Sequence, residues 1–228
     1  MKTFTIGKKK IVLKEEWMVG FITTWIVGLL AHAYRFFNFL PIWDSIYNFT
    51  GVGSTYTLGR WFLGYAGLIT SMFDLPWVNG AFSLFYISIV VILLTEMFEI
   101  KNKGMIVLCA AIFVSFPTVV SSFAYMYTAD AYLLAFLLAT LAVYLTWCVK
   151  KWGTIAGMVC LAFAMGIYQA YATVVIVLVL LYIIRQFVIE KLDFLEAVRK
   201  DLKYLGMLVG GAVPVSYTHL RAHETAAN

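Results

Sequence analysis

Residues 78–98 read VNGAFSLFYISIVVILLTEMF, and the only charged side chain in this stretch, Glu96, stands near its end. A helix needs about 20 apolar residues to cross a bilayer, so the stretch predicts a membrane-spanning helix. The whole chain agrees: 63% of its 228 residues are hydrophobic and 13% are charged, with a mean hydropathy of +0.88. Soluble domains carry about 25% charged residues. The sequence therefore predicts a polytopic helical membrane protein.

Further apolar runs predict an all-α fold, a transmembrane helical bundle with about six complete spans and a truncated seventh. The spans are expected at residues 17–34, 78–98, 105–120, 129–149, 153–167 and 172–187, and the seventh begins near Tyr204. The first span is interpreted as an uncleaved anchor, with a cleaved signal peptide as the alternative. Residues 188–203 alternate charged and apolar positions at helical spacing, which predicts an amphipathic surface helix.

The end of the chain differs in character from the rest. Residues 215–225, VSYTHLRAHET, closely resemble a translated sequencing adapter and interrupt the apolar run that begins near Tyr204. We expect residues 215–228 to be a non-native tail. Residues 1–214 are then expected to form the N-terminal part of a transmembrane domain.

The basic residues predict how the chain is oriented. Arg221 in the tail aside, every lysine and arginine except Arg35 and Arg60 falls at the N-terminus or in the segments 101–103, 150–151 and 185–203. Cytoplasmic loops are enriched in lysine and arginine, so the N-terminus is expected in the cytoplasm. The long segment 35–77 is then expected on the outer face. We expect it to hold an irregular part followed by a juxtamembrane helix, over residues 55–72.

Two acidic residues on the expected outer face are candidates for function. Asp44 follows an aromatic and apolar stretch close to the first span, where exclusion of water would favour a general base. The alternative for Asp44 is a solvated loop aspartate or a helix N-cap. Asp130 stands at the outer mouth of its span and is interpreted first as an interfacial helix cap and second as a ligand-binding residue.

Arg60 is the strongest basic candidate. On the expected juxtamembrane helix it shares one stripe with Gly64, Gly67 and Ser71, because these positions recur at steps of three and four. Small side chains there would leave a shallow groove beside the guanidinium, suited to a phosphate or an acyl chain. Alternatively, the glycines allow a neighbouring helix to approach closely and Arg60 reaches the lipid headgroups.

Three more residues complete the predicted outer site. Arg35, at the end of the first span, suits either a phosphate contact or an anchor for the span. Tyr168 and Gln169 form part of an outer turn. A tyrosine can stack on a sugar ring and an amide can bind its hydroxyl groups. We therefore treat all three as candidate substrate-binding residues.

Taken in order, a basic start, one span, an outer loop with Asp44, the motif Gly59-Arg60-Trp61 and the turn Tyr168-Gln169-Ala170 resemble the bacterial O-antigen type II glucosyltransferase family. The resemblance covers residues 15–213. Members are polytopic glycosyltransferases of the GT-C type and often carry paired acidic residues in the first outer loop, where Asp44 alone is expected here.

The resemblance implies an activity and its partners. Glucose would pass, with inversion, from a polyprenyl-phosphate carrier to a cell-surface polysaccharide on the outer leaflet of the bacterial inner membrane. The implied partners are the lipid-linked sugar, the polysaccharide acceptor and membrane lipid, with no nucleic acid. No cofactor or metal site is predicted, and the metal dependence of the reaction stays open.

We hypothesise that Asp44 is the general base and that Arg60 stabilises the departing phosphate. The alternatives are a polytopic transporter or lipid flippase, and a non-catalytic membrane scaffold. The predicted spans carry no charge at their centres, which argues against ion-coupled transport. A scaffold would tolerate the loss of both Asp44 and Arg60, whereas a glycosyltransferase would not.

Overall fold

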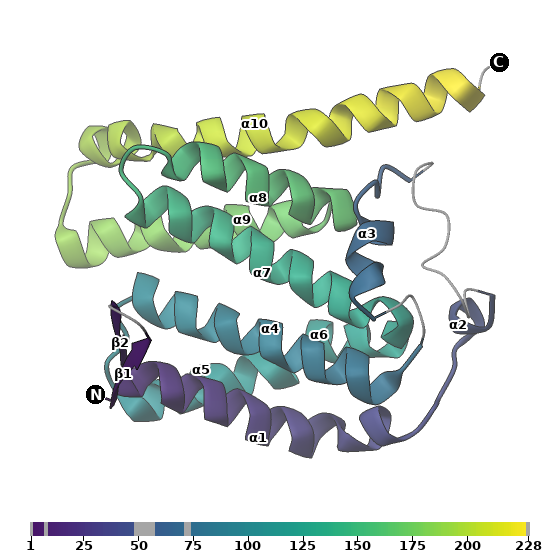
Figure 1. The fold of residues 1–228 in the computed structure, drawn as a ribbon. Helices are drawn as coiled ribbons and strands as arrows, with labels where there is room; N and C mark the ends of the chain where they lie inside the picture. Colours follow the sequence, from purple (N-terminus) through teal and green to yellow (C-terminus); the bar gives the residue numbers. More distant parts are fainter. Residues whose placement is uncertain (1, 7–8, 48–57, 71–73, 227–228) are drawn as a thin grey trace.

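The protein is a bundle of helices that run side by side along a common direction (Figure 1). The computed structural model describes the backbone of residues 2–6, 9–47, 58–70 and 74–226, and the side chains of 14–46, 58–70 and 74–218. The long helices are α1 (Glu15–Phe37), α4 (Pro76–Met97), α5 (Lys103–Ser115), α7 (Met126–Cys148), α8 (Gly153–Ile167), α9 (Tyr171–Arg185) and α10 (Phe194–Ala226). The short helical segments are α2 (Trp43–Tyr47), α3 (Leu63–Gly67), η1 (Leu68–Thr70), α6 (Pro117–Ser122), η2 (Phe123–Tyr125) and η3 (Gln186–Glu190).

Four helical stretches among the described residues are long and apolar enough to cross a membrane. They are Glu15–Phe37, Pro76–Met97, Lys103–Cys148 and Tyr171–Glu190. The third has 46 residues, and a straight helix of that length would be about 70 Å long, more than twice the hydrocarbon thickness. Instead the chain doubles back near α6, which brings the rings of Phe113 and Phe136 to 6.2 Å.

The helical, membrane-spanning character of the fold is thus as predicted, but the count of six spans and a truncated seventh is not confirmed. The shorter apolar helix α8 has 15 residues, which span about 22 Å.

Two helix starts have a clear local cause. Pro76 occupies the first turn of α4. At the start of α5, the side chain of Asn102 accepts a hydrogen bond from the amide of Met105 at 3.1 Å.

The predicted amphipathic helix over residues 188–203 is not a separate element. Residues Gln186–Glu190 form a π-helical turn, and Lys191 then adopts a left-handed conformation with φ 52°. Helix α10 begins at Phe194 and runs without a break into the predicted seventh span and past Pro214. The prediction that residues 215–228 are a non-native tail stays a prediction, since a helical backbone does not reveal the origin of its sequence.

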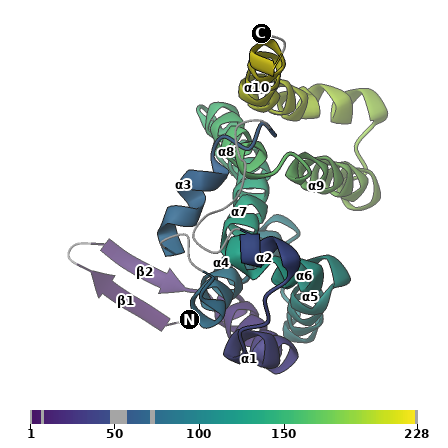
Figure 2. The ribbon, with the colours of Figure 1, turned by 90° about the vertical axis from the view of Figure 1, so that its right-hand side faces the viewer.

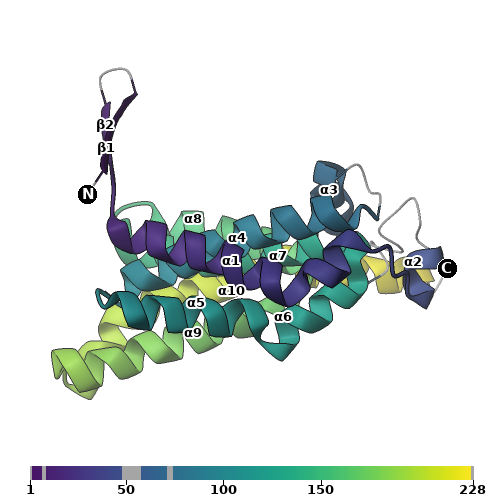
Figure 3. The ribbon, with the colours of Figure 1, turned by 90° about the horizontal axis from the view of Figure 1, so that it is seen from below.

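One hairpin stands outside the helical bundle. Strands β1 (Lys2–Ile6) and β2 (Lys9–Leu13) pair antiparallel, with Lys2 opposite Leu13. Figure 3 shows that the hairpin projects away from the helices. Its alternation of polar and apolar residues suits a strand, and the all-α prediction therefore holds for the bundle but not for this segment.

The core has two parts that meet at α4 and α7. One part joins α1, α4, α5 and α7 around Leu84, Ile87 and Met126, and the other joins α7 to α8, α9 and α10 around Leu161 and Met207. Figure 2 shows these two halves of the bundle one above the other. Close packing requires glycine at Gly80, since a Cβ there would lie 2.6 Å from the ring of Phe36.

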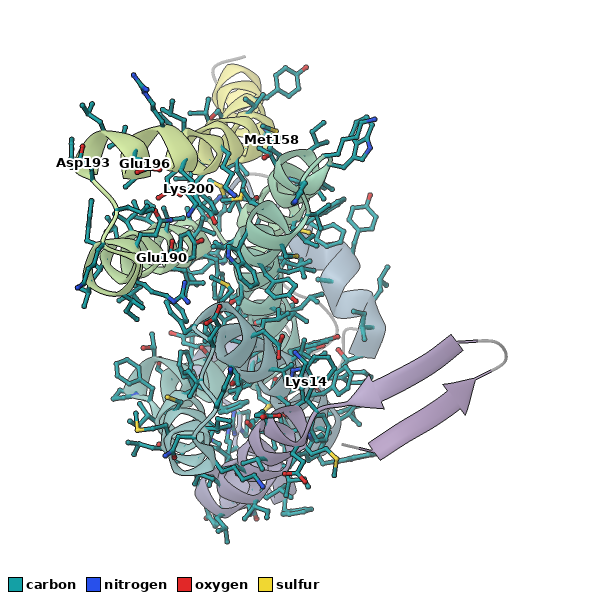
Figure 4. All side chains as sticks on the ribbon, turned by 90° about the vertical axis from the view of Figure 1, so that its left-hand side faces the viewer. Lys14, Met158, Glu190, Asp193, Glu196 and Lys200 are labelled. Carbon is teal, nitrogen blue, oxygen red and sulfur yellow. The ribbon has the colours of Figure 1, made fainter. Side chains whose placement is uncertain are left out.

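Charged residues gather at one end of the bundle, which we call the basic end (Figure 4). Lys14 pairs with Glu96 at 2.7 Å, and Glu190 accepts from Arg185 at 2.8 Å and from Lys200 at 3.2 Å. Helices α2 and α3 lie at the opposite end, which we call the loop end (Figure 1). The separation that the basic residues predicted between these two ends is therefore present in the fold.

Candidate active site

The segment from Leu58 to Thr70 lies at the loop end, against the turn between α8 and α9. The backbone amide of Phe62 donates to the carbonyl of Gly166 at 2.8 Å, and the side-chain amide of Gln169 donates to the carbonyl of Leu58 at 2.7 Å. Gly59 has φ 69°, a left-handed conformation that favours glycine. These contacts fix the segment to the bundle and orient Arg60.

The predicted helix over residues 55–72 is confirmed only in part. Leu63–Gly67 are α-helical and Leu68–Thr70 form a 3-10 turn, whereas residues 58–62 are not helical, and residues 55–57 and 71–72 lie outside the described residues. Arg60 lies in irregular backbone between two turns, and α3 begins only at Leu63. The reason is that the left-handed Gly59 and the bond from Phe62 to Gly166 are incompatible with a helix through Arg60. The predicted stripe of Arg60 with Gly64 and Gly67 on one helix is therefore absent.

The Arg60 guanidinium contacts two aromatic residues, Tyr132 of α7 and Tyr168 of the turn between α8 and α9. Its centre lies 4.6 Å from the ring centroid of Tyr168, and one of its terminal nitrogens donates to the hydroxyl of Tyr132 at 3.4 Å. Tyr132 and Tyr168 are themselves in ring contact at 5.4 Å. Among the described residues the buried Nε of Arg60 has no hydrogen-bond partner. The guanidinium as a whole is only half-buried, and a cation of this kind is suited to an anionic oxygen.

Asp44 lies on the short helix α2 and is exposed at the protein surface. The neighbouring Trp43 and Ile46 are also exposed and do not cover the carboxylate. Among the described residues Asp44 is therefore exposed to water, contrary to the expectation from its apolar neighbours. The charges of Asp44 and Arg60 are both within electrostatic range of the hydroxyl of Tyr127, a buried tyrosine of α7.

Arg35 is bound by backbone carbonyls. Its Nε donates to the carbonyl of Phe123 at 2.8 Å, and its terminal nitrogens donate to the carbonyls of Ala124, at 3.1 Å, and Leu40. These bonds hold the end of α1 to the η2 turn. The anchoring alternative is thus the one that the geometry favours for Arg35.

Asp74 is an acidic residue of this region that was not among the predicted site residues. It is only 8% exposed, and within the described part of the chain neither carboxylate oxygen makes a hydrogen bond. Burial raises the pKa of Asp74, whereas the charge of Arg35 and the nearby hydroxyl of Ser45 act to lower it. Because Ser45 follows Asp44, the far end of the loop supplies a second acidic group close to α2.

Asp130 is buried within the bundle and is 1% exposed. Its carboxylate accepts hydrogen bonds from the hydroxyl of Thr70 at 3.1 Å and from the side-chain amide of Asn79 at 3.3 Å. These bonds tie the end of the loop segment to α4 and α7. The geometry favours a structural part for Asp130 over the predicted contact with substrate, because a ligand could not reach the carboxylate without displacing Thr70 or Asn79.

The six predicted site residues therefore divide into two groups. Arg60, Tyr168 and Gln169 lie together at the loop end, with Asp44 in electrostatic range of the same tyrosine as Arg60. Arg35 and Asp130 hold the surrounding backbone. Within the described residues no group of three His, Cys, Asp or Glu side chains could hold a metal ion.

Gly166 gives a test of how the Arg60 segment is held. A Cβ at this position would lie 2.6 Å from the ring of Trp61, so Gly166→Ala is expected to displace the segment and to destabilise the protein by about 1–3 kcal/mol. Thermal unfolding in detergent would measure this. Gly206→Ala is the matched control, since nothing lies within 4 Å of its Cβ. Equal unfolding temperatures for the two variants would contradict the docking of Trp61 on Gly166.

Comparison with known proteins gives one match. The family model described as glucosyl transferase GtrII matches residues 33–221, which is more than four fifths of the chain and includes both the Arg60 segment and the turn at Gln169. No curated protein and no solved structure matches the chain.

Proposed function

Because the chain belongs to the GtrII family of glucosyl transferases, we propose that it transfers a glucosyl residue from a polyprenyl-phosphate donor to a cell-surface polysaccharide. The reaction would take place at the outer leaflet of the bacterial cytoplasmic membrane. The N-terminus and the basic end would face the cytoplasm, in keeping with the enrichment of lysine and arginine in cytoplasmic loops.

The observation that carries the proposal is the position of Arg60. Its guanidinium lies over Tyr168 at the loop end and is half-buried, not covered. A lipid-linked donor needs its phosphate at the membrane boundary, because the apolar chain stays in the bilayer. A cation stacked on an aromatic ring at that boundary suits such a phosphate.

The proposed reaction is a single displacement. The acceptor hydroxyl attacks the anomeric carbon of the donor glucose, and its proton passes to the carboxylate of Asp44. The bond between the anomeric carbon and the phosphate oxygen breaks, and polyprenyl phosphate leaves with one more negative charge. Arg60 stabilises that charge as it develops. Tyr168 supplies a ring that can pack against the sugar.

Asp74 offers an alternative acceptor for the proton. It is less exposed than Asp44, and its carboxylate oxygens have no hydrogen bond within the described region. We favour Asp44 because it is accessible at the surface. A general base that takes a proton from a polysaccharide hydroxyl must be accessible to that polysaccharide. Asp74 then keeps α2 and Arg35 in place through its charge.

A donor comparison tests the proposal against transport and scaffold functions. The full-length protein would be reconstituted in liposomes with acceptor polysaccharide and radiolabelled glucose on either polyprenyl phosphate or uridine diphosphate. We expect label in the polysaccharide from the lipid-linked donor and none above background from the nucleotide sugar. Transfer from the nucleotide sugar alone would overturn the donor assignment. Movement of the lipid between leaflets without transfer would favour a flippase.

A further inference from the structure

A large cavity lies between α5, α6, α7 and α9, and none of the candidate site residues is part of its lining. Its volume is about 640 Å³, within the roughly 300–1,000 Å³ of sites that hold small ligands. Ile112, Phe116, Val177 and Leu181 on its two rims are each about half exposed. The cavity therefore opens sideways on the surface of the bundle, at the depth of the membrane-spanning helices.

The lining of this cavity, which we call the lateral groove, is almost wholly apolar. Of its five hydroxyl side chains, three donate to backbone carbonyls of their own segments. Ser122 donates to the carbonyl of Thr118, Thr140 donates to that of Phe136, and Thr173 donates to that of Ala170. Apart from the hydroxyl groups of Thr118 and Tyr171, the surface left to a ligand consists mostly of methyl, methylene and aromatic groups. Such a surface selects against a sugar or a hydrated ion and suits a hydrocarbon chain.

The lateral groove adjoins the Arg60 site through a pair of tyrosines. Tyr171 lines the groove, and its ring contacts that of Tyr168 at 6.3 Å. Tyr168 in turn carries the Arg60 guanidinium. In Figure 2, α9, α5 and α6 lie on one side of α7 and α3 lies on the other, so the tyrosine pair connects the two sides at the loop end.

We propose that the lateral groove binds the isoprenoid chain of the lipid-linked donor, with the phosphate at Arg60 and the first isoprene units passing over Tyr168 and Tyr171. This rests on the proposed function, which supplies the identity of the lipid. The size of the groove suits part of one chain and not a whole two-chain phospholipid. The apolar chain would run from the loop end along α9 toward Leu181.

Crosslinking tests the groove without depending on catalysis. A polyprenyl phosphate with a diazirine in its chain would be added to the full-length protein in liposomes, irradiated, and the labelled peptides mapped. We expect labels on the groove residues of α5, α6 and α9, competed by unlabelled polyprenyl phosphate. Labels elsewhere on the protein would overturn the groove. Equal labelling by a diazirine phospholipid would show a general lipid contact and would also overturn it.

A matched pair of variants tests the same groove through kinetics. Val177 lines the groove, whereas its neighbour Ile176 is similarly exposed but lies outside the lining. Val177→Trp is expected to raise KM for a long-chain donor about tenfold, by displacing chain methylenes. It should leave a donor with one or two isoprene units unaffected, and Ile176→Trp should change neither. Equal effects of both variants on both donors would contradict the proposal.

The two readouts separate the groove from the reaction. Specific crosslinks in a protein that shows no transfer would support isoprenoid binding in the lateral groove and overturn the proposed function. Transfer from the lipid-linked donor, with crosslinks outside the groove, would leave the function standing and overturn the groove.

Discussion

Arg60→Ala is expected to lower the rate of glucosyl transfer by about 10²–10³-fold, the usual effect of removing one group that stabilises developing negative charge. Arg60 is the guanidinium that lies over Tyr168 and keeps a buried donor without a partner within the described residues. Steady-state transfer from lipid-linked glucose in liposomes would measure the loss. If Arg60 acts on the leaving phosphate in the transition state, the effect should fall mainly on kcat.

Two further variants sharpen this result. Arg60→Lys keeps the charge but loses the planar guanidinium, so it should recover only part of the activity. Arg199→Ala removes an exposed arginine from α10, on the segment at the basic end, and should leave transfer unchanged. Full activity in Arg60→Ala would show that Arg60 merely anchors the loop segment to lipid headgroups. Loss of protein from the membrane would instead indicate a folding defect, which thermal unfolding would reveal.

The sequence predicted the helices well, because the apolar character that a bilayer requires determines where they lie. Residues 78–98 and 172–187 must be apolar to lie in a bilayer, and helices form at both places. The turn at Gln169 could also be predicted from the sequence, since it separates two apolar runs. The predicted number of crossings is not confirmed. Two separate spans are expected at residues 105–120 and 129–149, and the structure has one 46-residue stretch there, Lys103–Cys148, that folds back within helical segments.

The site was less predictable, because long-range contacts determine it. A helical pattern runs through Arg60, but the amide of Phe62 binds the carbonyl of Gly166, more than 100 residues later. Asp74 looks like an ordinary acidic residue ahead of Pro76, and only its approach to Arg35 and Ser45 makes it unusual. Gly59 could have indicated that the predicted helix does not extend through Arg60, because a glycine readily adopts the positive φ that it has in the structure.

Asp44→Asn is expected to lower transfer by about 10²–10⁴-fold, because the amide fills the same space but cannot take the proton of the acceptor hydroxyl. The charge change must be controlled, since Asp44 also acts on Tyr127. Asp193→Asn removes an exposed carboxylate at the basic end and should keep full activity. Both variants would be assayed with lipid-linked glucose across a range of pH.

The pH dependence of these variants distinguishes the two acidic residues of the loop. If Asp44 is the base, Asp44→Asn should lose the acidic limb of the pH–rate profile, and Asp74→Asn should keep it while unfolding at a different temperature. The reverse pattern would assign the proton transfer to Asp74, whose burial already raises its pKa and so brings it closer to the working range of a base. Retention of both the rate and the acidic limb by Asp44→Asn would remove Asp44 from the mechanism.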